Sequence, residues 1–521
     1  MNGQKLLVAN RGEIAIRIFR AAADLGMASV AVAPADDQAS LHVSKADEAV
    51  VLPGRGASAY LDASAVLQAA RDTGATAIHP GYGFLSENAA FASACAEAGV
   101  VFVGPSPAAL SLFGDKHKAR NLAIELGVPV LPGVAAPTTV EAAEAFMSRL
   151  GPDAAGMVKA VAGGGGRGMR PVLTASDLPG AFARCQSEAA AAFGSGDLYV
   201  EQLIRRARHI EVQVIGDGKT VAHLWERDCS LQRQRQKLIE FAPAANLDPD
   251  VRDRLLQAAM TLAGASNYSS LGTFEFLVDR DSDAFFFIEA NPRLQVEHTV
   301  TEEVTGLNLV ELQLRLADGA TLDDLGLGSG AGPEPRGMAM QLRVNIETMQ
   351  PDGSAKPGGG VLTAFEPPSG AGVRVDSYGY AGYMTNPSYD SLLAKLIVLA
   401  GSGRAKDVTA KGYRALSEFQ IEGVPTNIAF LQTLLQDDAT RAGDVDTNYV
   451  EANAARLTAV GADAHPRRYP ATNPAAAPRP GRAGAQGDDA GGVIAHAGAI
   501  HVPAQAAAND HDAPPGHAAA A

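Results

Sequence analysis

Polar side chains recur at every second position within residues 285–298, FFFIEANPRLQVEH. They are Glu289, Asn291, Arg293, Gln295 and Glu297. If this segment is extended, period-two geometry puts all five on one face. Carboxylate and amide oxygens suit Mg²⁺, and a guanidinium suits an oxyanion. A half-buried strand with one wet face is the alternative, but Pro292 is poorly suited to a central strand and favours an irregular segment beside a site.

A second carboxylate lies within residues 272–277, GTFEFL, where Glu275 points opposite to its flanking phenylalanines if the segment is a strand. If this strand pairs with residues 285–289, Glu275 and Glu289 can share a face. Two carboxylates and an amide would then bind Mg²⁺ that bridges ATP phosphates. A solvated surface carboxylate is the alternative for Glu275.

A glycine run at residues 163–168 follows an apolar strand, residues 157–161, that carries Lys159. Consecutive glycines let backbone N–H groups converge on an anion, and the flanking Lys159 and Arg167 complement triphosphate charge. A flexible linker is the alternative, but the position after a strand favours a nucleotide site.

Two standard phosphate motifs do not fit. The segment 218–220, Gly-Lys-Thr, resembles the end of a Walker A loop, but Gln213 stands where its first glycine is required. These residues are better interpreted as a hairpin turn. The glycine run also does not open a Rossmann helix followed by an acidic residue on the next strand.

The elements that must position these groups begin with an alternation of strands and helices. Strands are predicted at residues 5–9, 29–33 and 75–79, and helices at 13–25 and 60–73. This order predicts a doubly wound parallel sheet over the first 110 residues. Residues 115–325 form a mixed α+β pattern, with strands at 210–215 and 273–278. Residues 338–448 combine short strands and turns with helices beginning near Ala405 and Thr426.

Composition excludes several classes of protein. The 521 residues carry a net charge of −15, which disfavours nucleic acid as a partner. No apolar run is long enough to span a membrane, and the N-terminus lacks the layout of a secretory signal, so a cytoplasmic location is expected. The three cysteines, at 95, 185 and 229, form no CxxC pair. After about Ala459 the chain is rich in Ala, Pro and Gly, which predicts a disordered tail or linker.

Six motifs together resemble the biotin carboxylase family of the ATP-grasp superfamily. They occur in family order from residue 5 to about 450. They are residues 9–15 (ANRGEIA), 79–88 (HPGYGFLSEN), the glycine run, 226–230 (ERDCS), 272–276 (GTFEF) and 289–298. The segments 291–293 and 298–301 are similar to those of pyruvate carboxylase and large fused carboxylases.

The resemblance implies a set of site residues. Nucleotide contacts would come from Lys116, Lys159, Gly164, Gly165, Gly166, Glu201, Ile204, His209, Gln232 and Leu277. Glu275, Glu289 and Asn291 would hold Mg²⁺ or Mn²⁺. Bicarbonate would lie among Lys237, Arg293, Gln295 and the backbone of Val296, with Glu297 as the base. Arg343 would face the biotin ureido oxygen and Tyr82 would line the same pocket.

The resemblance also implies a reaction and its partners. ATP would activate bicarbonate as carboxyphosphate, and biotin would then be carboxylated on a carrier protein. The biotin-bearing signature Ala-Met-Lys-Met is absent from this chain, so biotin is expected to be a carrier-bound substrate that is not attached to it. The carrier and the carboxyltransferase are expected on other chains or in a missing C-terminal part. A homodimer is expected. The final acceptor, an acyl-CoA, pyruvate or another compound, is left open.

The expected domains are residues 1–114, an ATP-grasp domain at 115–325 with a mobile glycine-rich lid at about 133–203, a C-terminal lobe at 336–448, and the tail at 459–521. Gln202 stands where the family usually has a lysine near the adenine, and residues 232–237 differ from the family pattern in their middle residues, which leaves the contact at Arg235 open. Two other hypotheses stay open. One is an ATP-grasp ligase that forms a carbamoyl or acyl phosphate, and the other is a scaffold that has lost activity.

Overall fold

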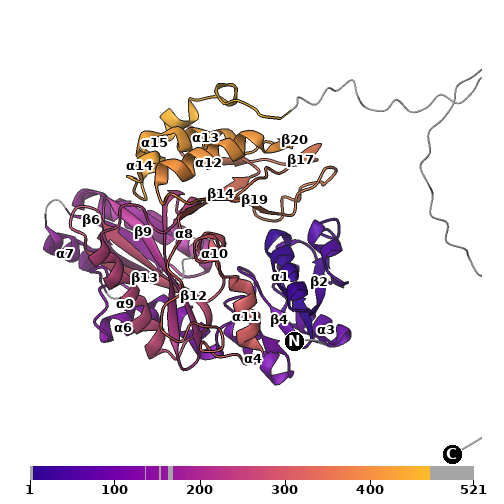
Figure 1. The fold of residues 1–521 in the computed structure, drawn as a ribbon. Coiled ribbons are helices and arrows are strands. Elements are labelled where there is room, and N and C mark those ends of the chain that lie inside the picture. Colours follow the sequence, from indigo (N-terminus) through magenta and orange to yellow (C-terminus); the bar gives the residue numbers. More distant parts are fainter. Residues whose placement is uncertain (1–3, 135–136, 152–153, 162–167, 470–521) are drawn as a thin grey trace, which may run out of the picture. The chain divides into compact units, whose positions relative to one another are not determined.

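The N-terminal strands pair in parallel, as the alternation of strands and helices predicts. The computed structural model describes residues 4–134, 137–151, 154–161 and 168–469 (Figure 1). Within them β1 (Lys5–Val8) pairs in parallel with β2 (Ala28–Pro34) and with β4 (Ala77–His79). The strands β3 (Glu48–Leu52) and β5 (Val101–Phe102) complete the order β3-β2-β1-β4-β5.

Alternate side chains of β1 enter two different cores. Leu6 and Val8 pack with residues of α1 (Gly12–Asp24), whereas Leu7 packs with residues of α3 (Ala63–Thr73) and α4 (Ala89–Glu97). Because successive strand residues point to opposite faces, helices cover the sheet on both sides. The predicted doubly wound sheet is therefore confirmed. The remaining helices of this region are α2 (Gly56–Ala59), α5 (Pro107–Phe113) and α6 (Lys116–Glu125).

Strands between residues 207 and 400 form an antiparallel sheet of eight strands. Its order is β13-β12-β9-β10-β11-β14-β19-β18. The pairing of β11 with β14 joins the strands of the 115–325 region to those that follow residue 336. The strand bounds are β9 (Ala207–Asp217), β10 (Val221–Arg233), β11 (Gln236–Ala242), β12 (Ser269–Asp279), β13 (Phe285–Asn291), β14 (Met338–Asn345), β18 (Val373–Ser377) and β19 (Leu392–Ala400).

Residues 218–220 form the predicted turn, because β9 and β10 are antiparallel neighbours and the amide of Asp217 donates to the carbonyl of Thr220. Three helices lie between strands of this sheet in the sequence. They are α9 (Pro249–Ala265), α10 (His298–Thr305) and α11 (Leu309–Ala317).

A smaller layer contains the strand that precedes the glycine run. The strands β6 (Ala155–Ala160), β7 (Met169–Val172) and β8 (Leu198–Leu203) form an antiparallel sheet in the order β7-β6-β8. It packs on α7 (Val140–Leu150) and α8 (Leu178–Phe193) through its own apolar cluster. Gly164, Gly165 and Gly166, expected at the nucleotide, lie outside the described residues.

The C-terminal lobe surrounds β14, β18 and β19 with helices and two short antiparallel strand pairs, β15 with β16 and β17 with β20. The helix predicted near Ala405 is α12 (Ala405–Glu418), and the one predicted near Thr426 is α13, which begins at Ile428 and ends at Gln436. The other elements are β15 (Glu347–Met349), β16 (Ala355–Pro357), β17 (Ala364–Glu366), β20 (Gln420–Glu422), α14 (Asp438–Ala442) and α15 (Tyr449–Thr458). Beyond α15, His465 is hydrogen-bonded to Tyr413 and Thr433, so the chain stays packed on this lobe up to about residue 469.

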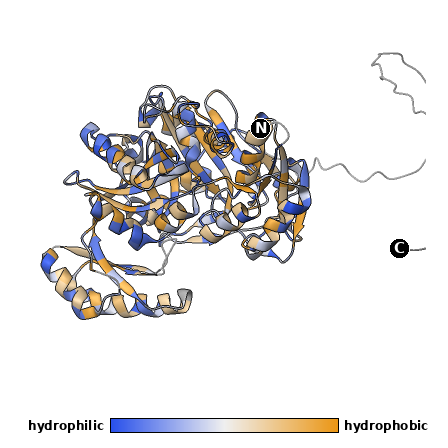
Figure 2. Cartoon of the chain, turned by 90° about the horizontal axis from the view of Figure 1, so that it is seen from below, coloured by the Kyte–Doolittle hydropathy of each residue, from blue (hydrophilic) through white to orange (hydrophobic). Residues whose placement is uncertain are grey.

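Alternation within the eight-stranded sheet separates an apolar face from a polar one. Ile210, Val212 and Phe274 pack with α9 in one core. Their neighbours in the sequence are polar and point to the other face, where they are still buried: His209, Glu211, Gln213, Thr273 and Glu275. Figure 2 shows the same pattern more widely, with apolar and polar residues interleaved along the helices and strands. The fold thus builds a buried polar surface, which needs internal partners.

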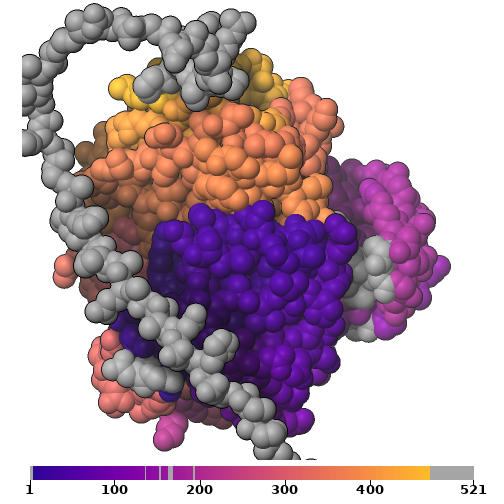
Figure 3. Space-filling model, turned by 90° about the vertical axis from the view of Figure 1, so that its right-hand side faces the viewer, coloured from indigo at the N-terminus to yellow at the C-terminus, as the bar shows by residue number. Residues whose placement is uncertain are grey.

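The N-terminal region and the C-terminal lobe contact each other directly (Figure 3). Arg11 forms an ion pair with Asp37 and stacks 3.8 Å from the ring centroid of Tyr389. The Tyr380 hydroxyl donates to the carbonyl of Ala39 at 2.7 Å. In the described part of the chain, no helix is both long and apolar enough to cross a membrane.

Candidate active site

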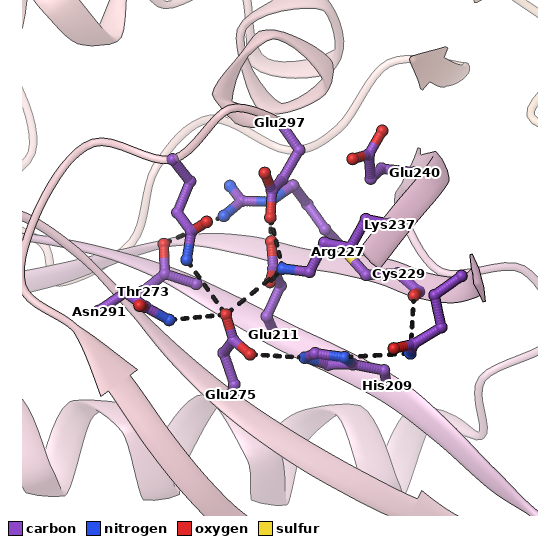
Figure 4. A network of polar contacts seen from close by, with 12 residues as sticks. His209, Glu211, Arg227, Cys229, Lys237, Glu240, Thr273, Glu275, Asn291 and Glu297 are labelled. Carbon is purple, nitrogen blue, oxygen red and sulfur yellow. Dashed lines mark hydrogen bonds and ion pairs between the residues drawn. The ribbon is translucent and has the colours of Figure 1, made fainter. Parts of the chain in front are cut away.

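Lys237 on β11 lies at the centre of the polar face. Its ammonium is 2.5 Å from Glu297, 2.6 Å from Glu211 and 3.4 Å from Glu275 (Figure 4). The three carboxylates come from β9, β12 and the residue just before α10. One cation therefore joins three segments that are far apart in the sequence.

Arg227 on β10 supports this centre from within the protein. Its guanidinium is completely buried and donates to Glu211 at 2.6 Å and to Gln213 at 2.8 Å. It also donates to the hydroxyls of Thr301 at 3.0 Å and Thr273 at 3.1 Å. Because one planar guanidinium donates to four side chains, it fixes the positions of these side chains relative to one another.

Glu275 accepts hydrogen bonds from Asn291, which was predicted to accompany it, and from Gln295, which was predicted at the bicarbonate site. It accepts from Asn291 at 2.7 Å and from Gln295 at 3.1 Å, and His209 lies 2.7 Å from its other oxygen. Gln232 in turn approaches His209 at 3.5 Å. The structure therefore brings these predicted site residues into one connected group.

Glu275 and Glu289 are directly opposite each other across β12 and β13. The predicted shared face is therefore confirmed. Lys116, at the start of α6, is 2.6 Å from Glu289, and both side chains remain partly exposed. Glu275 is buried, whereas Glu289 is partly exposed. The two carboxylates therefore lie where the interior meets an accessible edge.

A second ion pair joins two strands of the smaller sheet. Lys159 on β6 pairs with Glu201 on β8. Nearby in the sequence, Ile204 belongs to an apolar cluster with Leu131 and Ala207, against which Leu277 packs. Residues expected around the nucleotide thus contribute an ion pair and an apolar surface.

Arg293 and Tyr82 reach the site from the loops. Arg293 donates to Glu87 at 2.5 Å and to the side-chain oxygen of Asn291 at 2.9 Å. The Tyr82 hydroxyl donates to Glu13, a buried carboxylate on α1.

Arg343 on β14 contacts the base predicted for the reaction. It donates to Glu297 at 3.0 Å and to Glu240 at 2.6 Å. Burial alone would raise the pKa of Glu297, but Lys237, Arg343 and Arg227 lower it well below its ordinary value. In contrast, burial raises the pKa of Glu240 despite the same arginine. Glu297 is therefore held as a carboxylate between two cations.

The polar stripe is a strand only at its beginning. β13 ends at Asn291, and residues 292–297 leave the sheet before α10. The single extended face predicted conditionally for all five side chains is therefore limited to Glu289 and Asn291, as Pro292 indicated. The other three still reach the same group, because the irregular segment folds back over it.

Several residues of this group were not assigned to the site from the sequence, although Glu13 and Arg227 lie within the motifs 9–15 and 226–230. Glu211, Glu240 and Glu13 contact predicted site residues, and Arg227 contacts Glu211. A signal existed for Glu211, since His209, Glu211 and Gln213 alternate within an otherwise apolar segment. Glu240 and Glu13 carry no local sign of which partners they meet.

Comparisons with known proteins agree along the chain. Residues 2–110 match the biotin carboxylase N-terminal domain, 115–325 the carbamoyl-phosphate synthase L chain ATP-binding domain, and 341–452 the biotin carboxylase C-terminal domain. The mitochondrial pyruvate carboxylase of Homo sapiens is 47% identical over 86% of this chain. The pyruvate carboxylase of Bacillus subtilis is 46% identical over 86%. The chain spans 38% and 39% of the length of these two relatives.

Solved structures give the same result. The biotin carboxylase domain of a single-chain bacterial carboxylase is 50% identical, with a TM-score of 0.79, and the alignment covers 88% of this chain and 100% of that domain. The biotin carboxylase domain of Hydrogenobacter thermophilus 2-oxoglutarate carboxylase, solved with MgADP and bicarbonate, is 38% identical over 87% of this chain and 98% of that one, with a TM-score of 0.81. The chain belongs to the biotin carboxylase family of ATP-grasp ligases.

Proposed function

We propose that this chain carboxylates biotin on a carrier protein, using ATP and bicarbonate, as the first half-reaction of an acyl-CoA or pyruvate carboxylase. The observation that carries the proposal is Glu297. This buried carboxylate is held between Lys237 and Arg343 and next to the acidic pair Glu275 and Glu289. A base, an anion-binding cation and metal-type ligands thus occur together.

The donor set fits a divalent cation on the Glu289 side. Glu275, Glu289 and the Asn291 oxygen are hard ligands on neighbouring strands. At Glu211, Glu275 and Glu297 the buried Lys237 ammonium fills the position between the carboxylates. Lys116 contacts Glu289 and Arg293 donates to the Asn291 oxygen, but Lys116 and Glu289 are partly exposed, so an ion would displace these cations at the accessible edge. We therefore assign Glu275, Glu289 and Asn291 to Mg²⁺ or Mn²⁺. When bound, the ion would neutralise the charge of the ATP phosphates.

ATP would lie between the smaller sheet and β12. Lys159 and Lys116 would meet its phosphates, together with Gly164, Gly165 and Gly166 of a lid at about residues 133–203. The purine and ribose would contact Glu201, Ile204, His209, Gln232 and Leu277. Two ion pairs, Lys159 with Glu201 and Lys116 with Glu289, support this role, because each holds a cation beside the proposed pocket.

Bicarbonate would bind among Lys237, Arg293, Gln295 and the Val296 main chain. Glu297 would take its proton as a bicarbonate oxygen attacks the γ-phosphorus, which gives carboxyphosphate and ADP. Bicarbonate is a stable anion and a poor nucleophile, so positioning and charge neutralisation are the main contributions. In this arrangement the Lys237 ammonium would exchange its contact with Glu297 for a contact with bicarbonate. Because Glu297 would then lose a neighbouring cation, it would become a stronger base.

Carboxyphosphate would then break into carbon dioxide and phosphate. The phosphate takes the N1′ proton of biotin, and the ureido nitrogen attacks carbon dioxide to give carboxybiotin. A ureido N–H is a very weak acid, so its anion needs a fixed cation at the oxygen. Arg343 is suited to this, since Glu240 and Glu297 fix its guanidinium, and Tyr82 would line the same pocket.

We further propose that the chain divides at the boundaries expected from its sequence, that it forms a homodimer, and that a biotin carrier and a carboxyltransferase act with it. The biotin carboxylase domain from Hydrogenobacter thermophilus was solved as a dimer, which supports the second point.

The test is incorporation of labelled bicarbonate into free biotin by the purified chain with Mg-ATP. Label that depends on both ATP and biotin is the expected result. Ammonia-dependent formation of carbamoyl phosphate without biotin would favour the other ATP-grasp ligase. ATP binding with no turnover at any bicarbonate concentration would favour a scaffold.

A further inference from the structure

Lys395 is a charged residue inside an apolar strand. It is the fourth residue of β19, LLAKLIVLA, and its side chain is completely buried. Its ammonium lies 2.9 Å from Glu13, 3.2 Å from the carbonyl of Val296 and 3.9 Å from Asp376. A buried ammonium without partners would cost several kcal/mol, so a lysine here requires these partners.

The three partners, one hydrogen-bonded carbonyl and two ion-paired carboxylates, come from three parts of the chain. Glu13 is on α1 of the N-terminal sheet, Val296 is in the loop after β13, and Asp376 is on β18 of the C-terminal lobe. Lys395 is also directly opposite Arg343 in the pairing of β14 with β19. Side chains directly opposite on an antiparallel pair project to the same face, so both cations project toward the site.

Two of these partners belong to, or contact, the proposed substrate sites. Val296 lies between Gln295 and Glu297 in the bicarbonate segment. Glu13 accepts the hydroxyl of Tyr82, which is proposed to line the biotin pocket. Lys395 contacts Val296 directly and Tyr82 by way of Glu13. It therefore connects the loop that would hold bicarbonate to the tyrosine that would line the biotin pocket.

We propose that Lys395 is a positioning residue for this reaction. The inference rests on the proposed function. By holding the Val296 carbonyl and the Glu13 carboxylate, Lys395 fixes the bicarbonate loop and the Tyr82 hydroxyl relative to each other. It touches neither substrate, so it acts through these two residues. An error of about 1 Å in such positioning can cost on the order of a hundredfold in rate.

The direct test is Lys395→Met in the full chain, with steady-state ADP formation measured against bicarbonate, ATP and free biotin. The expected result is a rise of about tenfold or more in KM for bicarbonate and a fall in kcat, with KM for ATP within about twofold of wild type. Equal changes in all parameters, or none, would contradict the proposal.

A second variant separates positioning from folding. Lys395→Met leaves Glu13 buried without its cation, which is destabilising. The double variant Lys395→Met with Glu13→Gln removes that charge and should recover thermal stability, while KM for bicarbonate stays high. Recovery of bicarbonate binding together with stability would show that Lys395 is only structural.

Arg252→Met is the matched control. Arg252 pairs at 2.9 Å with Glu226, another fully buried carboxylate, which no proposed substrate contacts. It should lower stability without changing KM for bicarbonate. A wild-type chain with no bicarbonate-dependent ADP formation would instead contradict the proposed function itself, whereas an active wild type with an unchanged Lys395→Met variant contradicts only the role of Lys395.

Discussion

Arg343 and Glu297 are 46 residues apart in the sequence, yet the guanidinium of one donates to the carboxylate of the other at 3.0 Å. This contact joins the proposed biotin-binding cation on β14 to the proposed base before α10. It forms because β11 pairs with β14, which brings the C-terminal lobe to the edge of the site. The two halves of the proposed reaction therefore share one hydrogen-bonded group.

Replacing Glu297 with Gln should abolish the proposed base and preserve the shape of the site. Proton transfer by a positioned group contributes about a hundredfold or more to rate. We therefore expect kcat for bicarbonate-dependent ADP formation to fall at least about a hundredfold, with ATP affinity within about threefold. Steady-state kinetics and nucleotide titration measure both. A rate within fivefold of wild type would rule out Glu297 as the base.

Removing a proposed metal ligand should weaken the response to Mg²⁺ specifically. In Glu289→Gln, one of the two carboxylates on the shared face of β12 and β13 is lost. The Mg²⁺ concentration for half-maximal activity should rise by about tenfold, in line with the 10- to 100-fold effects seen when metal sites lose support. Glu97→Gln, at an exposed residue on α4, is the control. An unchanged Mg²⁺ requirement in Glu289→Gln would contradict the assignment.

Glu302 on α10 should contribute stability that disappears in acid. Burial would raise its pKa, but Arg17 and Arg374 lower it below the ordinary value. A lowered pKa gives stability that is complete above the unfolded pKa of about 4.3 and is lost as the pH falls through the folded pKa. Glu302→Gln should therefore cost about 3 kcal/mol at pH 7 and progressively less below about pH 4. Denaturant unfolding at several pH values measures this. A cost that does not change with pH would show that the ion pairs contribute little.

Local patterns were sufficient for much of this site. The alternation of Phe and Glu within residues 272–277 correctly placed Glu275 opposite the apolar core, and the register confirms its pairing with Glu289. Pro292 correctly indicated that the polar stripe would not remain a strand. Strand and helix alternation likewise identified the parallel sheet, although its second long helix begins at Ala63 rather than Tyr60.

Long-range partners could not be predicted in this way. The contact of Lys395 with Glu13 depends on how the C-terminal lobe, through β18, packs against α1. The contact of Lys237 with Glu297 likewise joins β11 to the residue before α10, 60 positions further along the chain. The sequence contains only a hint of the first, a single lysine inside the apolar run 392–400. Such a residue is costly to bury alone, so the pattern indicates that partners exist but not which ones.

The most direct test of the account is ADP release by the purified chain with Mg-ATP, with and without bicarbonate and free biotin, beside an Arg343→Ala variant. Wild type should turn over only with bicarbonate and be stimulated by biotin. The variant should lose the biotin-dependent rate by about a hundredfold or more, because the cation that stabilises the ureido anion is gone. A matched surface control, Arg315→Ala on α11, should leave both rates unchanged. ADP release that is indifferent to bicarbonate and biotin, or equal in wild type and Arg343→Ala, would contradict the account.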